Sequence, residues 1–213
     1  MSVEKISARP VGAEKRIKNP RKSVAKRMEI YLIRHTSVSV EAGICYGQSD
    51  VPVAESFAAE AAQVRAKLPP QPLVVHSSPL SRCRLLAESL DGQDARLDSR
   101  LLEMNFGAWE LRRWDDIGLG SLNAWTEDVA HERCPDGESY FDVYHRAAAF
   151  WRDCVRERPE RAAIVTHGGV IRALVAHLLE MPLEKSLRVN VDFGGVTNIS
   201  FWQDVPIIGY INR

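Results

Sequence analysis

Two arginines and two histidines are the residues of this sequence whose types and positions best suit chemistry. Each follows a short apolar run: Arg34 and His35 follow residues 30–33, Arg82 comes soon after 73–75, and His167 follows 162–166. A guanidinium group binds phosphate oxygens through paired donors and stays charged, and a neutral imidazole can act as a nucleophile. Brought together, these four side chains would form a phosphate-binding site that contains its own nucleophile.

Such a meeting requires that the three apolar runs be strands of one sheet, since open α/β sheets carry their sites at the carboxyl ends of the strands. Strand and helix patterns alternate along the chain, which is typical of an α/β fold with a doubly wound, mostly parallel sheet and helices on both faces. The predicted strands are 29–34, 73–75 and 162–166, with further extended pieces at 95–97, 101–103, 187–191, 198–202 and 207–210. The predicted helices are 56–67, 81–90, 139–158 and 169–179, with an irregular helical insertion at 111–134 over the active-site edge.

Length and composition predict a single domain, residues 28–213, preceded by a basic extension. The chain has 213 residues, of which 45% are hydrophobic and 26% charged, which is ordinary for a globular protein. Residues 1–27 hold nine Lys/Arg and two Glu, a net charge of +7, and their composition predicts disorder. A basic tail could bind nucleic acid or anionic lipid. We favour the simpler interpretation, an upstream extension before Met28.

The sequence offers no membrane span and no spacing typical of a metal site. No apolar run approaches the ~20 residues of a span, and the amino terminus lacks the apolar core of a secretory signal. The four cysteines lie far apart, at Cys45, Cys83, Cys134 and Cys154. We therefore expect a cytoplasmic protein with ordinary thiols, no bound metal and no cofactor.

Four motifs together resemble the histidine phosphatase superfamily, which also contains the phosphoglycerate mutases. They are Arg34-His35-Thr36, the segment SSPLSR at 77–82, Leu101-Leu102-Glu103 followed by Phe106-Gly107, and His167-Gly168-Gly169. They occur in the family's order between residue 29 and about residue 180. The resemblance implies a phosphoglycerate mutase-like fold and a phosphatase that needs no metal.

The resemblance also implies a role for each motif residue. His35 would be the nucleophile that forms a phosphohistidine, and the nearby arginines would help to keep it neutral. Glu103 would be the general acid that protonates the leaving oxygen and later takes a proton from water. His167 would stabilise the charge of the transition state. The phosphoryl group would be bound by Arg34, Arg82, His167 and Gly168.

The sequence departs from the family pattern directly after the first motif. Thr36 stands where the family usually has glycine, and Val38 and Glu41 replace its threonine and asparagine. That asparagine commonly helps to bind phosphate in the broader family. A backbone amide of residues 43–47 could take its place.

Two further segments resemble the alpha-ribazole phosphatase branch: GICYGQSDVP at 43–52 and FGAWE at 106–110. This resemblance implies hydrolysis of alpha-ribazole 5′-phosphate, or of the corresponding cobamide phosphate, during assembly of the cobalamin nucleotide loop. A flat base needs an aromatic or apolar wall, for which Tyr46, Phe106 and Trp109 are candidates. The alternative for Trp109 is that it packs the helical insertion onto the sheet.

Other functions of the same fold remain open: a phosphoglycerate mutase, a protein phosphatase or a non-catalytic phosphate-binding protein. The mutases carry Arg-His-Tyr-Gly where this chain has Met-Asn-Phe-Gly at 104–107, although Arg112 and Arg113 could bind a second anionic group. An insertion over the pocket favours small substrates, and retention of the motif histidines, arginines and Glu103 favours an enzyme. We therefore expect a small phosphate monoester as the partner, and neither a membrane nor nucleic acid.

Overall fold

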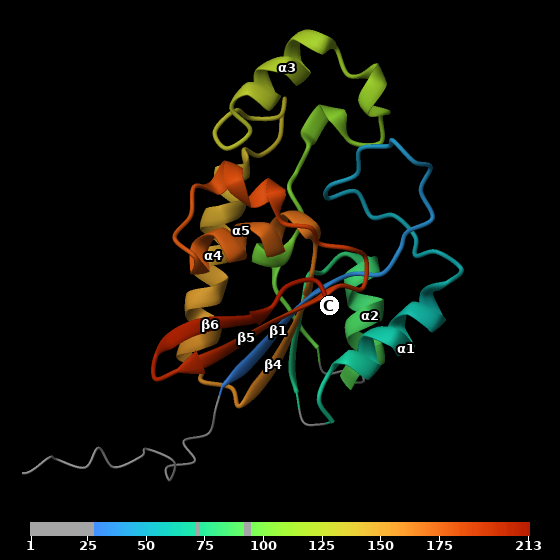
Figure 1. Cartoon of the computed structure of the whole chain (residues 1–213). Helices are drawn as coiled ribbons and strands as arrows, with labels where there is room; N and C mark the ends of the chain where they lie inside the picture. Colours follow the sequence, from blue (N-terminus) through green and yellow to red (C-terminus); the bar gives the residue numbers. More distant parts are fainter. Residues whose placement is uncertain (1–27, 71–72, 92–94) are drawn as a thin grey trace, which may run out of the picture.

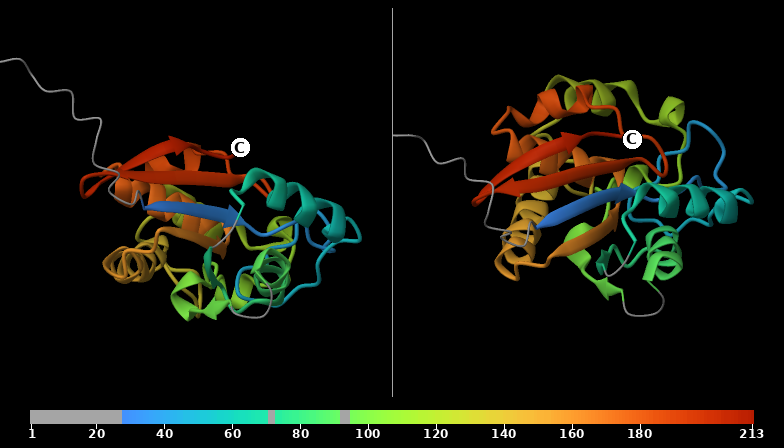
Figure 2. Two further views of the ribbon diagram at one scale, coloured as in Figure 1. Left: turned by 90° about the horizontal axis from the view of Figure 1, so that it is seen from below. Right: turned by 60° about the horizontal axis from the view of Figure 1, so that its bottom comes forward.

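The computed structural model describes residues 28–70, 73–91 and 95–213, and the predicted extension 1–27 lies outside them. The described residues form a six-stranded sheet in the order β3-β2-β4-β1-β5-β6. The strands are β1 (Glu29–Arg34), β2 (Val74–Ser77), β3 (Arg96–Leu97), β4 (Arg161–Thr166), β5 (Val196–Trp202) and β6 (Val205–Tyr210). Both views of Figure 2 show four of these strands in the order β6, β5, β1 and β4.

The sheet is parallel from β3 to β1, which confirms the predicted mostly parallel sheet, and it is antiparallel from β1 to β6. β1 and β4 run in register, with Arg34 opposite Thr166. Ser77, the last residue of β2, lies opposite Val165. All three strands therefore deliver the segments that follow them to one edge of the sheet.

Helices cover both faces of this sheet. They are α1 (Phe57–Lys67), α2 (Ser81–Asp91), α3 (Leu119–Glu127), α4 (Tyr140–Arg156) and α5 (Gly168–Leu178). The period of two in β1 sorts its side chains between two cores. Ile30 and Leu32 join the core that contains α4 and α5, whereas Tyr31 and Ile33 join the core that contains α1 and α2. Figure 1 shows the two helix pairs on opposite sides of the strands.

The helical insertion lies at the top of the molecule in Figure 1. It contains a 3₁₀ turn (η3, Trp114–Asp116) and α3, and it leads into α4. The start of α4 follows the sequence prediction: Ser139 Oγ accepts a hydrogen bond from the amide of Asp142, whose carboxylate accepts one from the amide of Ser139. This capping box satisfies two amides at the helix start.

Two predicted strands are wrong. Leu101 ends a 3₁₀ turn (η1, Ser99–Leu101), and residues 102–103 follow it, because the Asp98 side chain accepts a hydrogen bond from the amide of Arg100 and starts a turn. Residues 187–191 follow and partly form a 3₁₀ helix (η4, Leu183–Arg188). The amide of Val189 donates to the carbonyl oxygen of Ser186, so the chain continues the turn of η4 where a strand was predicted. Within the described residues, none of the helices has the length and apolarity that crossing a membrane requires.

Candidate active site

The register of β1 and β4 places the two motif histidines side by side. Because Arg34 is opposite Thr166, the next residue of each segment, His35 or His167, leaves the sheet at the same edge. The two imidazole ring centroids are 5.1 Å apart in an edge-to-face arrangement. Both side chains are buried, with His35 only 2% exposed.

The hydrogen bonding of His35 fixes its tautomer. Its Nδ1 lies 2.7 Å from the carbonyl oxygen of Thr36. A carbonyl oxygen can only accept a hydrogen bond, so Nδ1 carries the proton and Nε2 holds the lone pair. Burial, together with the positive charges of Arg82 and Arg34, lowers the pKa of His35 to about 3. The neutral, nucleophilic form therefore dominates near neutral pH.

The two motif arginines are held by main-chain carbonyl oxygens. Nη1 of Arg34 donates to Val191 at 2.6 Å, and Arg82 donates to Gly47 at 2.6 Å and to Ser49 at 2.9 Å. Within the part of the chain that the structure describes, the buried Nε atoms of both arginines have no hydrogen-bond partner. A carbonyl group does not neutralise a guanidinium charge, so both arginines keep charge and a donor for an anion.

His167 lies at the start of α5, where it is the N-cap residue. Its Nε2 is 2.8 Å from Ser78 Oγ and 3.5 Å from the thiol sulfur of Cys83. Burial and the nearby positive groups lower the pKa of His167, so it too is neutral. In this structure Ser78 occupies the nitrogen that a phosphoryl oxygen could otherwise approach, and the predicted contact of His167 with phosphate stays a prediction.

The side chain of Glu103 also contacts the start of α5. Its carboxylate accepts hydrogen bonds from the amide of Gly169 at 3.1 Å and from that of Met104 at 3.0 Å. A Cβ atom on Gly169 would lie 2.4 Å from Glu103 Oε1, so only glycine permits this approach. The charge of Glu103 acts on Arg34, so the carboxylate lies within electrostatic range of one of the two motif arginines.

Glu110, the next acidic residue along the chain, stabilises a loop. Its carboxylate accepts hydrogen bonds from the amides of Gln48, Ser49 and Phe106. It therefore holds the loop whose carbonyl oxygens hold Arg82. Gly47 makes this loop possible, because a Cβ atom there would lie 2.0 Å from the carbonyl oxygen of Met104.

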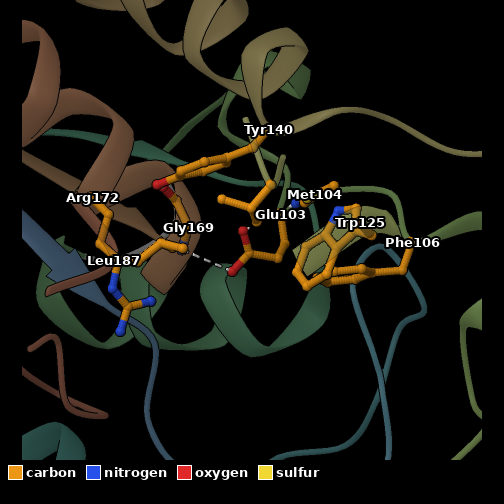
Figure 3. Close-up of a pocket in the computed structure, with 9 residues that line it drawn as sticks. Glu103, Met104, Phe106, Trp125, Tyr140, Gly169, Arg172 and Leu187 are labelled. Atoms are coloured by element: carbon orange, nitrogen blue, oxygen red, sulfur yellow. Dashed lines mark hydrogen bonds between the residues drawn. The ribbon is translucent and has the colours of Figure 1, made fainter. Parts of the chain in front are cut away.

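A pocket opens directly beside Glu103, with a cavity volume of about 150 Å³. Figure 3 shows Tyr140 on one side of the Glu103 carboxylate, the rings of Trp125 and Phe106 on another, and Gly169 and Arg172 opposite those rings. The remaining lining side chains are apolar: Met104, Val129 and Leu187. The pocket therefore has aromatic and apolar walls beside the Glu103 carboxylate.

The three residues predicted to form the pocket wall lie in three different environments. Phe106 lines the pocket. Tyr46 lies by the arginines instead, with the Arg82 guanidinium carbon 5.5 Å from its ring centroid. Trp109 is 3% exposed and packs at its ring edge against Trp114 and Trp125, so it supports the wall from behind.

Gly168 and the departures from the family pattern can also be placed. A Cβ atom on Gly168 would lie 3.5 Å from Arg34 Nε, so the first residue of α5 adjoins the arginine predicted to bind phosphate. Glu41 forms an exposed ion pair with Arg113. The amide of Cys45 donates to the carbonyl oxygen of Arg112, so that amide of the 43–47 loop is already used.

Sequence reasoning missed several residues that shape this site. Phe193 lies over Arg34, with its ring centroid 3.8 Å from the guanidinium carbon, and 5.4 Å from the His35 ring. Trp125, Tyr140 and Arg172 come from three separate helices, α3, α4 and α5. Nothing in their spacing signals the pocket, because only the packing of those helices brings them to Glu103. Among the described residues, no cluster of three His, Cys, Asp or Glu side chains could hold a metal ion.

Comparisons with known proteins agree with this geometry. The family model described as the histidine phosphatase superfamily, branch 1, matches residues 30–213. The curated protein "Probable phosphoglycerate mutase GpmB" of Escherichia coli O1:K1 is 29% identical over 190 residues, which cover 84% of this chain and 87% of that protein.

Two solved structures are similar over most of both chains. The alpha-ribazole phosphatase from Shigella flexneri has a TM-score of 0.79 and 26% identity, and covers 87% of this chain and 96% of that one. The mycobacterial glucosyl-3-phosphoglycerate phosphatase has a TM-score of 0.78 and 26% identity, and covers 88% of this chain and 99% of that one. The chain belongs to branch 1 of the histidine phosphatase superfamily.

Proposed function

We propose that this protein is a phosphomonoesterase that acts through a phosphohistidine. Nε2 of His35 attacks the phosphorus of the ester, a P–N bond forms, and the P–O bond to the leaving group breaks. Glu103 gives its proton to the leaving oxygen. Water then attacks the phosphohistidine, Glu103 takes a proton from that water, and inorganic phosphate leaves with His35 restored.

The arginines make this attack possible. A phosphate monoester repels nucleophiles through its negative oxygens, so the site must neutralise them and hold the attacker in line. Arg34 and Arg82 both act electrostatically on His35. Within the described part of the chain, Nε of each arginine has no hydrogen-bond partner. These free donors suit the equatorial oxygens of a transferring phosphoryl group.

The substrate that we propose carries a flat, apolar leaving group, as alpha-ribazole 5′-phosphate and the corresponding cobamide phosphate do. The observation that carries this proposal is the aromatic wall beside Glu103, made by Phe106, Trp125 and Tyr140. Flat rings pack favourably on such walls. The similarity to the Shigella flexneri alpha-ribazole phosphatase supports the same choice, as do the two segments at 43–52 and 106–110.

A second candidate is a phosphatase for small anionic acids that carry a phosphate. The observation that favours it is Arg172, a cation that lines the same pocket. Nε of Arg172 donates to the carbonyl oxygen of Val189 at 2.9 Å, so the side chain is oriented without a carboxylate partner on that nitrogen. A substrate carboxylate could pair with the rest of this guanidinium. Arg113, in contrast, is already paired with Glu41.

A steady-state comparison distinguishes the two candidates. We would measure kcat/KM for alpha-ribazole 5′-phosphate, phosphoserine, 3-phosphoglycerate and glycerol phosphate, with His35→Ala as the blank. An advantage of ~100-fold for the ribazole ester corresponds to about 2.7 kcal/mol of transition-state binding and supports the first candidate. An equal advantage for the anionic acids supports the second. Turnover that survives in His35→Ala would reject the phosphohistidine route itself.

The aromatic wall has its own matched test. Trp125→Leu should raise KM for the ribazole ester by ~10-fold and leave KM for glycerol phosphate within ~2-fold, because only the flat base needs the ring. The control is Trp202→Leu, which alters a 69% exposed tryptophan at the end of β5. Equal effects of the two variants would argue against a base-binding wall.

A further inference from the structure

Arg146 and Glu138 form a half-buried ion pair that contacts the loop carrying Glu103. Arg146 lies in α4, and Glu138 immediately precedes the N-cap of that helix. Nε of Arg146 donates to Glu138 Oε1 at 2.9 Å, and Nη2 donates to Oε2 at 3.0 Å. Their side chains are 17% and 21% exposed. Such a paired, fork-like contact fixes the direction of the guanidinium plane.

The remaining donors of Arg146 all go to the Glu103 loop. Nη1 donates to the carbonyl oxygens of Arg100, at 2.9 Å, and Leu102, and Nη2 donates to that of Glu103 at 2.8 Å. A guanidinium group has five N–H donors, and Arg146 uses all five here, two on Glu138 and three on the loop. Lysine could keep the charge but could not reproduce this fork.

Glu138 holds the same loop from its other end. Its Oε2 accepts a hydrogen bond from the amide of Asn105 at 2.9 Å and one from Gln48 Nε2 at 3.4 Å. The same Gln48 nitrogen donates to the carbonyl oxygen of Glu103 at 3.0 Å. The carbonyl oxygen of Glu103 is therefore held by Arg146 and Gln48, and the amide of Asn105 is held by Glu138.

We propose that the Arg146–Glu138 pair positions Glu103 for proton transfer to the leaving oxygen. The proposal rests on the phosphatase function proposed above and adds two positioning residues to it. A general acid works only when its carboxyl group lies within hydrogen-bond reach of the oxygen that it protonates. The loop that carries Glu103 is a 3₁₀ turn followed by irregular chain, so its geometry depends on side-chain contacts and not on a helix or strand.

The test uses leaving groups of different basicity. An alkyl phosphate needs protonation of its leaving oxygen, whereas a nitrophenyl phosphate needs little. The parameter is kcat/KM, because it covers the steps up to departure of the leaving group and excludes hydrolysis of the phosphohistidine. We expect Arg146→Lys to lower kcat/KM for glycerol phosphate by ~30- to 100-fold, as a misplacement of about 1 Å can. For p-nitrophenyl phosphate the loss should stay within ~3-fold.

Matched variants separate positioning from a general loss of structure. Arg133→Lys weakens another ion pair at the start of α4, with Asp142, and should leave both esters within ~2-fold. Glu138→Gln keeps the shape but leaves one acceptor oxygen in place of two, so the side chain can no longer accept from both Arg146 Nε and the Asn105 amide. It should show the same ester-dependent loss as Arg146→Lys. It also serves as the test if Arg146→Lys does not fold, as judged by circular dichroism.

Two kinds of result would contradict the proposal, and they have different consequences. Equal slowing of both esters in a folded variant, or no slowing of either, would overturn the positioning role and leave the phosphatase intact. Absence of any His35-dependent activity in the wild type, against both esters, would instead overturn the proposed function and this inference with it.

Discussion

Nδ1 of His35 lies 2.7 Å from the main-chain carbonyl oxygen of Thr36. This contact assigns the proton to Nδ1 and the lone pair to Nε2, a choice that the sequence alone leaves open. The partner is a backbone atom, so threonine supplies it as well as the family's glycine would. The departure from the family pattern at Thr36 therefore does not remove the contact that orients His35.

The depressed pKa of His35 makes stability depend on pH. Its pKa is 6.5 when unfolded and about 3 in the folded protein. Between these values the unfolded chain binds a proton that the folded protein does not, so the free energy of unfolding falls as pH falls below about 6.5. His35→Gln removes this contribution, which is at most about 1.4 kcal/mol per pH unit. Urea unfolding of both proteins at about pH 6.5 and about pH 4.5 should show the steeper fall in the wild type; parallel losses would contradict the burial of a neutral His35.

Glu103→Gln should separate esters by their leaving groups. Glutamine keeps the size of the side chain and its place beside Gly169 but cannot transfer a proton. We expect kcat/KM for glycerol phosphate to fall by ~100-fold or more, and that for p-nitrophenyl phosphate to change by only a few-fold. Glu110→Gln is the informative neighbour, because Glu110 holds the loop beneath Arg82 and should affect both esters alike. A uniform effect of Glu103→Gln would remove Glu103 from the acid role.

Gly169→Ala should disturb the same carboxylate through space. The added Cβ would lie 2.4 Å from Glu103 Oε1, so the carboxylate must move and lose its contact with the Gly169 amide. We expect ~10- to 100-fold lower kcat/KM for glycerol phosphate with a change in Tm of only a few degrees. Gly120→Ala is the control, since its Cβ would meet nothing within 4 Å. Full activity of Gly169→Ala would show that Glu103 tolerates displacement.

Activity should survive exhaustive chelation. Two guanidinium groups held by carbonyl oxygens supply positive charge beside His35, and supplying positive charge is the task that metal ions perform in other phosphatases. We expect the rate with p-nitrophenyl phosphate to be unchanged after dialysis against EDTA. Loss of activity that added Mg²⁺ or Zn²⁺ restores would require a different mechanism.

The sequence was sufficient for the residues that follow strands and insufficient for those brought in by packing. Arg34, His35 and His167 could be placed together because parallel strands in register end at one edge. Trp125 and Arg172 could not, since they lie on helices whose relative placement no local pattern encodes.

Trp109 shows that a position close to a motif in the sequence need not line the pocket. Its neighbourhood in the sequence suggests the pocket, yet its side chain is buried behind Trp114 and Trp125. The predicted strand at 187–191 was wrong because its alternating apolar residues resemble a strand, whereas the hydrogen bonds of η4 extend to the amide of Val189.

The central claim is that Nε2 of His35 carries the phosphoryl group during turnover, and the most direct measurement is to trap it. The enzyme would be mixed with p-nitrophenyl phosphate, quenched rapidly in alkali and digested, and the peptides examined by mass spectrometry. The account predicts one added phosphoryl group on the peptide that contains His35, attached at Nε2, labile to acid and absent from His35→Ala. Phosphate on another residue, or an unlabelled enzyme under conditions in which the breakdown of the intermediate limits turnover, would contradict it.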